Sequence, residues 1–197
     1  MEMEEIRQKG LRNNKKIWKA IQTILEEIGE NPSREGLQRT PYRYAKACEE
    51  WFGGYGKDPR DILDRTFSKE KYSGIVLVKD IICYSHCEHH ITPMILKLHI
   101  GYIPNKHITG LDKIPKLAEI YARRLQNQER LTDQIADAMY RILKCKGVMV
   151  ICEGTHFCMC SRGVRQQDSK TVTSSIRGVF KNKSARDEFL ALVRKDE

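Results

Sequence analysis

Two short clusters of cysteine and histidine residues carry the clearest chemistry in this sequence. The first, at residues 85–90, reads Ser-His-Cys-Glu-His-His, and it places Cys87 and His90 at the Cys-x-x-His spacing that lets a tight turn direct two side chains to one ion. The second, at residues 156–160, reads His-Phe-Cys-Met-Cys. Each cluster comes just past the end of a predicted strand. If those two strands are neighbours, their ends bring the clusters together and form a metal site.

A site made of two cysteines and one histidine has a specific chemical meaning. It would leave the fourth position of a tetrahedral zinc ion to water, which is typical of catalytic rather than structural zinc. Zinc can lower the pKa of bound water to about 7. His89 and His156 would then be ionisable neighbours able to move protons. A structural site would instead recruit Cys160 or His89 as a fourth ligand and exclude the water.

The remaining cysteines are expected to be structural. The chain has seven cysteines, an odd number, and no readable secretory signal, which favours free thiols in a reducing compartment and a cytoplasmic location. We expect Cys48, Cys83, Cys145 and Cys152 to be buried. The longest apolar run is far shorter than the roughly 20 residues that a membrane span needs.

Basic side chains near these clusters indicate an anionic partner. The chain has 35 lysines and arginines against 26 acidic residues, a formal charge of +9. Lys113 and Lys116 lie one turn apart near the start of a predicted helix, and Arg162 follows the second cluster. Cationic side chains and a helix N-terminus together favour phosphate, although a solvated basic face would give the same pattern.

Gln128 and Glu129 stand in the break between two predicted helices. A carboxylate accepts two parallel hydrogen bonds from a pair of N–H donors, such as guanine N1–H and its 2-amino group. Helix capping by Glu129 is the alternative interpretation.

The elements that must position these residues follow from hydrophobic periodicity. Helical spacing at 14–30 and 41–52 predicts an N-terminal helical extension spanning residues 1–58. In residues 59–197 we predict strands at 75–82 and 94–102, helices at 114–125 and 131–142, strands at 148–153 and 171–180, and a final helix at 185–194. This order favours an α+β fold, an antiparallel four-stranded sheet with two helices on one face. Its two open edges favour oligomerisation.

Several motifs resemble those of the GTP cyclohydrolase I family. Besides the clusters at 85–90 and 156–160, they are Pro-Ser-Arg-Glu-Gly-Leu at 32–37, Thr-Pro-Tyr-Arg at 40–43, Gly-Tyr-Ile-Pro at 101–104, Tyr-Ala-Arg-Arg-Leu-Gln-Asn-Gln-Glu-Arg-Leu-Thr at 121–132 and Ser-Arg-Gly-Val at 161–164. The resemblance runs in the same order along residues 17–193. It implies a tunnelling-fold enzyme that converts GTP to 7,8-dihydroneopterin triphosphate and formate, assembled as a toroidal homodecamer with active sites between subunits.

The resemblance also implies a role for each site residue. Cys87, His90 and Cys158 would hold Zn²⁺, whose water hydrates C8 of the guanine, and His89 and His156 would transfer protons. The substrate-binding residues it implies are Glu129 with Gln128 at the guanine edge, Lys113, Lys116 and Arg162 at the triphosphate, and Arg43 reaching the triphosphate from an adjacent subunit.

Three residues depart from the family pattern: Asp112, Lys116 and Leu96, the last at a position that is often glycine. Asp112 stands where the family usually has serine, and it should repel triphosphate unless it pairs with Lys113 or Lys116 or engages the sugar. Lys116 replaces a usual arginine and gives up bidentate phosphate geometry.

Two other functions fit the same residues. One is a relative acting on another purine nucleotide, such as dGTP. The other is a zinc-stabilised basic module that binds nucleic acid, which would need four protein ligands. We expect neither a nucleic-acid nor a membrane partner.

Overall fold

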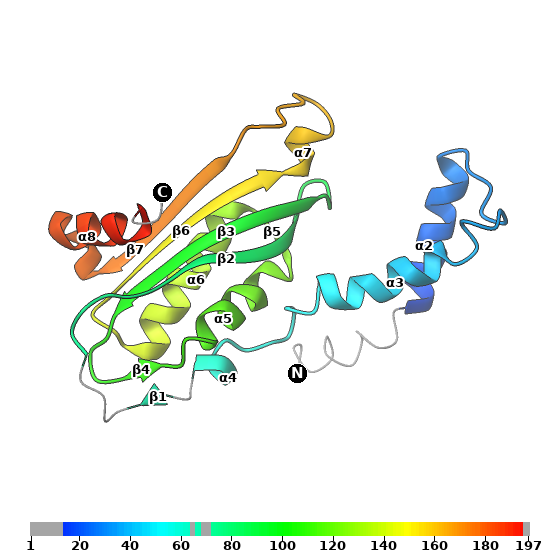
Figure 1. The fold of residues 1–197 in the computed structure, drawn as a ribbon. Helices are drawn as coiled ribbons and strands as arrows, with labels where there is room; N and C mark the ends of the chain where they lie inside the picture. The colour runs from blue at the N-terminus through cyan, green and yellow to red at the C-terminus, as the bar shows by residue number, and fades with distance from the viewer. Residues whose placement is uncertain (1–13, 64–65, 68–71, 195–197) are drawn as a thin grey trace. The chain divides into compact units, whose positions relative to one another are not determined.

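A computed structural model describes residues 14–63, 66–67 and 72–194, and the chain divides into two compact units, residues 1–56 and 57–197 (Figure 1). The first unit holds α2 (Asn14–Glu27) and α3 (Thr40–Trp51), which pack against each other. Pro41 lies in the first turn of α3, where its missing N–H costs no helical hydrogen bond. Both helices were predicted from the sequence, although α2 ends before the predicted residue 30.

The second unit is built on a five-stranded sheet in the order β5-β2-β3-β6-β7. The four long strands are antiparallel, as predicted, and β5 pairs in parallel with β2. The strands are β2 (Val76–Cys87), β3 (Pro93–Ile103), β5 (Leu125–Gln126), β6 (Gly147–His156) and β7 (Thr171–Gly178).

The predicted four-stranded antiparallel sheet is therefore wrong in one respect, because the sheet is mixed. Leu125 continues the apolar period of the preceding helix, so the sequence pattern placed it there. The helix instead ends at Ala122, and Leu125 pairs with His86 as the first residue of β5. Two residues of strand are too short to show an alternating pattern.

Helices cover both faces of this sheet. Val148 and Val150 of β6 belong to the main core under α5 (Lys113–Ala122) and α6 (Gln128–Leu143), whereas Met149 packs with Phe189 of α8 (Lys183–Arg194). Because successive strand residues point to opposite faces, α8 lies across the sheet from α5 and α6. The side chain of Asn127 caps α6 by accepting a hydrogen bond from the backbone N–H of Arg130.

The shorter elements complete the second unit. They are α4 (Arg60–Leu63), a small antiparallel sheet of β1 (Thr66–Phe67) and β4 (Ile108–Thr109), α7 (Phe157–Cys160) and the 3₁₀-helix η1 (Val179–Lys181). Among the described residues, none of the helices is long and apolar enough to cross a membrane.

Four cysteines that we predicted to be structural are buried: Cys48, Cys83, Cys145 and Cys152. Burial raises the pKa of Cys145 to about 11 and of Cys152 to about 12, and it raises the pKa of Cys83 further. These thiols are therefore protonated near neutral pH and pack as small apolar groups.

Candidate metal centre and its surroundings

The two predicted clusters meet at one end of the sheet. The sequence expectation required β2 and β6 to be neighbours, but β3 lies between them. Met94 at the start of β3 pairs with Ser85 on one side and with His156 on the other, so the ends of β2 and β6 flank it. This single row of the sheet brings the chain just before Cys87 close to the chain just before Cys158.

Cys87, His90 and Cys158 form the group that could hold a metal ion. Their ligand atoms all lie within 4.8 Å of one another, and Cys87 Sγ lies 4.0 Å from His90 Nδ1. Tetrahedral zinc with these donors would place sulfur and nitrogen about 3.6 Å apart, close to what the side chains already provide. Two sulfurs and an imidazole nitrogen are also the donor types that zinc prefers. The chemistry and the spacing of the group therefore fit a zinc ion.

The elements that carry this group differ from the predicted ones in detail. Cys87 is the last residue of β2 rather than a residue past its end, and Cys158 lies in α7. Cys87 is buried, Cys158 is partly buried and His90 is exposed, so the group opens to solvent on the histidine side. Burial and the adjacent Cys87 raise the pKa of the Cys158 thiol, and binding of a metal would have to remove that proton.

The turn that carries the first cluster is tightly bonded and strained. The backbone N–H of Cys87 donates to the carbonyl of Thr92 and the N–H of Ile91 donates to the carbonyl of Cys87, both at 2.8 Å. Ile91 has a φ of +54°. That is the left-handed region, which a β-branched residue enters only when its surroundings force it. Close bonding across the turn keeps this conformation in place.

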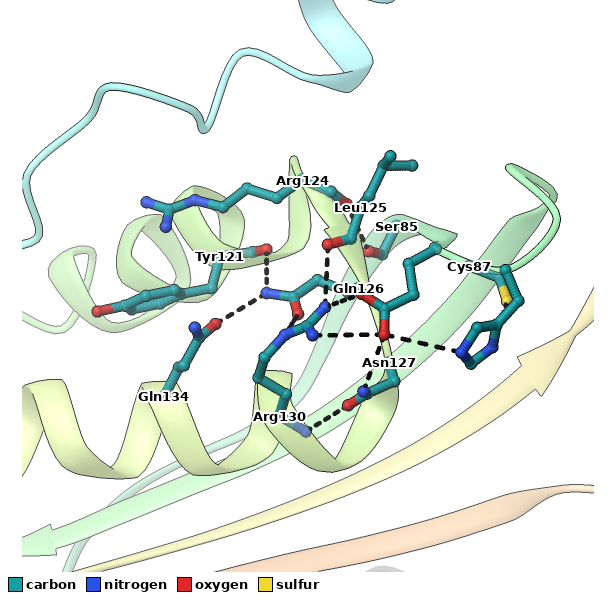
Figure 2. A network of polar contacts seen from close by, with 11 residues as sticks. Ser85, Cys87, Tyr121, Arg124, Leu125, Gln126, Asn127, Arg130 and Gln134 are labelled. Carbon is teal, nitrogen blue, oxygen red and sulfur yellow. Dashed lines mark hydrogen bonds and ion pairs between the residues drawn. The ribbon is translucent and has the colours of Figure 1, made fainter. Parts of the chain in front are cut away.

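A second set of contacts ties the same turn to the start of α6 (Figure 2). The carboxylate of Glu88 forms an ion pair with Arg130 and accepts a hydrogen bond from Asn127 Nδ2 at 3.1 Å. The Arg130 hydrogen bond holds the pKa of Glu88 below its ordinary value. The backbone N–H of Glu88 also donates to the carbonyl of Gln126 at 2.9 Å. These contacts therefore anchor Glu88, which lies between the metal-binding Cys87 and His89.

The side chain of Gln126 helps to hold the Arg130 guanidinium in place. Its side-chain oxygen accepts from Arg130 Nε at 3.0 Å, and its amide donates to the Tyr121 carbonyl and to Gln134 Oε1 (Figure 2). The sequence analysis did not identify Glu88 or Arg130, because no spacing rule links two residues so far apart in the chain. Only the charge of each could have suggested an ion pair.

The two predicted proton-transfer histidines have different environments. His89 is exposed, with Nδ1 3.9 Å from Cys87 Sγ and Nε2 3.8 Å from Glu88 Oε1. His156 is half-buried at the end of β6, and Nε2 lies 2.7 Å from Gln128 Oε1. Burial lowers the pKa of His156, so the neutral ring is favoured near neutral pH.

The side chains of Gln128 and Glu129 lie in different environments. Gln128 is 1% exposed, and its amide is committed to groups of β6 and β7 and to His156. Glu129 is exposed in the first turn of α6 and lines a pocket of about 490 Å³ together with Asp133 and Ser175. Glu129 is therefore available to a ligand, whereas the Gln128 side chain is already fully hydrogen-bonded.

The predicted phosphate-binding residues do not all lie at the metal group. Arg162 does, because its Nη1 lies 2.7 Å from His90 Nε2. Lys113 and Lys116 lie at the start of α5, whose C-terminal end leads into β5 beside Cys87. Figure 1 accordingly shows β4, just ahead of α5, and α7 at opposite ends of the sheet. Arg43 is an exposed residue of α3 in the first unit.

Asp112 pairs with both lysines, which is one of the arrangements that the sequence analysis left open. Its Oδ2 lies 2.6 Å from Lys116 Nζ and 3.9 Å from Lys113 Nζ. The hydrogen bond from Lys116 holds the pKa of Asp112 below its ordinary value. The carboxylate thus offsets part of the positive charge that these lysines present.

Comparison with known proteins relates most of the chain to one family. The profile of the family described as GTP cyclohydrolase I matches residues 17–194. The chain is 51% identical over 182 residues to GTP cyclohydrolase 1 of Desulforamulus reducens, covering 91% of this chain and 97% of that protein. It is 49% identical over 177 residues to GTP cyclohydrolase 1 of Brucella canis, covering 89% of this chain and 83% of that protein.

Similar solved structures are more distant. The apo crystal structure of the archaeosine synthase QueF-Like has a TM-score of 0.46 and 16% identity, covering 55% of this chain and 97% of that one. A dihydroneopterin aldolase from Burkholderia thailendensis bound to guanine has a TM-score of 0.35 and 11% identity, covering 59% of this chain and 93% of that one.

Proposed function

Because this chain belongs to the GTP cyclohydrolase I family, we propose that it is a zinc-dependent enzyme that hydrolyses GTP to 7,8-dihydroneopterin triphosphate and formate. The observation that carries the zinc assignment is the convergence of Cys87, His90 and Cys158, whose ligand atoms lie within 4.8 Å of one another. Three protein donors of these types match a catalytic zinc site, which keeps a position open for water or substrate.

Zinc bound by these three residues would supply a Lewis acid that lowers the pKa of water and so favours hydration of the purine ring at neutral pH. The chain's own residues do the rest. His89 and His156 exchange protons with the opening imidazole ring, and burial keeps His156 neutral and able to accept a proton.

The substrate is held by groups of complementary shape and charge. Glu129 is free of side-chain partners among the described contacts and accepts the guanine N1–H and 2-amino protons from its position at the pocket wall. The Gln128 side chain is buried and already hydrogen-bonded to β6, β7 and His156, so we infer that it supports the site without contacting guanine directly. Arg162 beside His90 takes the phosphate groups nearest the metal.

We infer that other triphosphate contacts come from a second subunit. α5 has ten residues, so Lys113 lies about 15 Å along the helix from the end that adjoins the metal group. A neighbouring copy can bring its own Lys113 and Lys116 to that group, and Arg43 as well. This division supports a homo-oligomer with sites between subunits, in which the family's homodecamer is the assembly we propose. The sheet edge at β7 supports it too, since β7 has a strand partner on one side only within the described chain.

Incubation with GTP tests this function directly. We expect stoichiometric release of formate and a pterin that becomes fluorescent after oxidation, lost after zinc is removed by a chelator and regained when zinc is added. GTP and dGTP should be compared side by side, because a clear preference for dGTP would instead identify a relative with a different substrate. Binding of nucleic acid without release of formate would contradict the proposal.

A further inference from the structure

We propose that Gln128 is a positioning residue that holds His156 as the tautomer with its proton on Nε2, which leaves Nδ1 as the nitrogen that accepts protons during catalysis. This builds on the proposed function, in which His156 moves protons. Gln128 does not touch the substrate in this role. It acts through the ring that it fixes.

The orientation of the Gln128 amide is determined by its surroundings. The side-chain nitrogen lies 2.9 Å from the carbonyl oxygen of Cys152 and 3.0 Å from that of Thr171. Backbone carbonyls only accept hydrogen bonds, so the amide NH₂ must face them. The reversed amide would place its oxygen against both carbonyls inside a buried site, where an unpaired acceptor costs about 1–3 kcal/mol.

The orientation of the amide in turn determines the tautomer of the ring. Gln128 Oε1 faces His156 Nε2 at 2.7 Å. An amide oxygen cannot donate, so Nε2 must carry the proton. In a neutral imidazole the other nitrogen then holds the lone pair, and here that nitrogen is Nδ1. The choice of base nitrogen is therefore made by two backbone carbonyls, one in β6 and one in β7.

Gly154 provides independent support, because it leaves the room that this amide occupies. A Cβ atom at residue 154 would lie 2.1 Å from Gln128 Oε1 and 3.0 Å from its Cδ. Gly154 lies in β6 two residues before His156, and its φ is not in the left-handed region, so the backbone conformation alone does not require glycine there. The need for glycine there follows from the Gln128 side chain and from nearby Leu96.

Solid-state ¹⁵N NMR of zinc-loaded, histidine-labelled protein at pH 8 tests the proposal without measuring turnover. We expect a protonated Nε2 and an unprotonated Nδ1 for His156, assigned by the loss of these signals in His156→Asn. A protonated Nδ1 would overturn the proposal. Because this measurement does not depend on the reaction, it stands even if GTP is not the substrate.

Variants link the tautomer to the rate. Gln128→Met keeps the length of the side chain and removes both polar groups, so it should produce a mixture of tautomers and lower kcat about 10- to 100-fold with little change in KM. Gly154→Ala should shift the amide and change the same NMR signals.

Thr132→Val is the matched control. Its hydroxyl contacts the backbone carbonyl of Gln128 and the hydroxyl of Thr173, each at 2.7 Å, but not the amide itself. The two backbone carbonyls that orient the amide remain in this variant, so it should lower stability while keeping the tautomer and kcat. Equal loss of kcat in Thr132→Val and Gln128→Met would show a merely structural role. A Gln128→Met variant that keeps the wild-type tautomer and kcat would also overturn the proposal.

Discussion

At the scale of single residues, the sequence was most informative where chemistry demands particular atom types. Cys87 and His90 could be paired from their spacing. The family resemblance then selected Cys158 from a second cluster that also contains His156 and Cys160, and the structure brings these three residues together. The side chain of Gln128 could not be placed in this way. Its partners are backbone groups of two strands, and no residue type in the sequence marks them.

Removing a metal ligand should abolish both metal binding and activity. Cys158→Ala and His90→Ala each leave two donors, so we expect loss of stoichiometric zinc, measured by elemental analysis, and a fall in GTP turnover of at least about 1,000-fold. Size-exclusion chromatography should show an unchanged assembly. Cys160→Ala is the comparison, since retained zinc there would exclude Cys160 as a fourth ligand. A zinc-loaded, active Cys158→Ala enzyme would refute the assignment.

Glu129 should decide recognition of guanine. Glu129→Gln keeps the size of the side chain but replaces one acceptor oxygen by a donor, which opposes the guanine 2-amino group or N1–H. We expect binding of GTP to weaken by about 1–3 kcal/mol, a roughly 5- to 150-fold rise in Kd measured by calorimetry. Unchanged affinity for GTP would show that Glu129 only caps α6.

At the scale of elements, the fold was predictable where apolar residues repeat over many positions, and it was not where pairing is short. The helices and long strands follow from periodicity, whereas β5 is two residues long and joins the sheet because the α5–α6 connection runs beside β2. That same short strand places Gln126 and Arg130 against Glu88. The support of the metal-binding turn therefore depends on the part of the fold that periodicity cannot reveal.

Loss of the Glu88–Arg130 pair should loosen the metal-binding turn. Arg130→Ala leaves the Glu88 carboxylate with the Asn127 hydrogen bond and the longer contact to His89, while Ile91 remains strained. We expect affinity for zinc to fall about 10- to 100-fold in competition with a chelating dye. Arg141→Ala is the matched control, because Arg141 also pairs with an acidic residue on α6 but lies far along the helix from the turn. Equal affinities in the two variants would contradict the role of Arg130.

The contact between α6 and β7 should weaken in acid. Asp133 accepts hydrogen bonds from Arg177 and Ser175, and the Arg177 hydrogen bond chiefly holds its pKa below the ordinary value. A carboxyl with a lowered folded-state pKa stabilises the fold above its unfolded pKa of about 3.9, and that contribution is lost as the pH falls through the folded-state pKa. The Tm difference between wild type and Asp133→Asn should be constant above about pH 5 and shrink below about pH 4. A difference that does not depend on pH would contradict this.

At the scale of the whole molecule, one chain does not bring all the expected substrate contacts to the metal group. Arg162 contacts His90, but Lys113 and Lys116 begin α5 and pair with Asp112. A sequence contains no information on which copy of a residue serves a given site, and the separation of these lysines from the metal group became apparent only once α5 had a direction relative to β5.

Mixing two inactive variants tests whether sites are shared between subunits. Lys113→Ala should lack the phosphate contact and Cys158→Ala the metal ligand. If each site takes Lys113 from one chain and Cys158 from another, a mixed oligomer can contain sites in which both residues are intact. Random assembly of equal amounts of the two variants gives about a quarter of such sites, because each contributing chain is the required variant half of the time. We expect that fraction of wild-type activity after dissociation and reassembly of the mixture. No recovery would place both residues in the same subunit's site.

Because most cysteines of the chain are buried, the few that are partly exposed can be followed by chemical modification. Cys83, Cys145 and Cys152 are shielded and stay protonated at neutral pH, so an alkylating reagent added to the folded protein encounters Cys158 and Cys160 as its partly exposed targets. Of these two, only Cys158 belongs to the metal-binding group. The ratio of modified Cys158 to modified Cys160 in a mass spectrum would therefore report how much of a preparation carries its ion, with Cys160 as the internal standard.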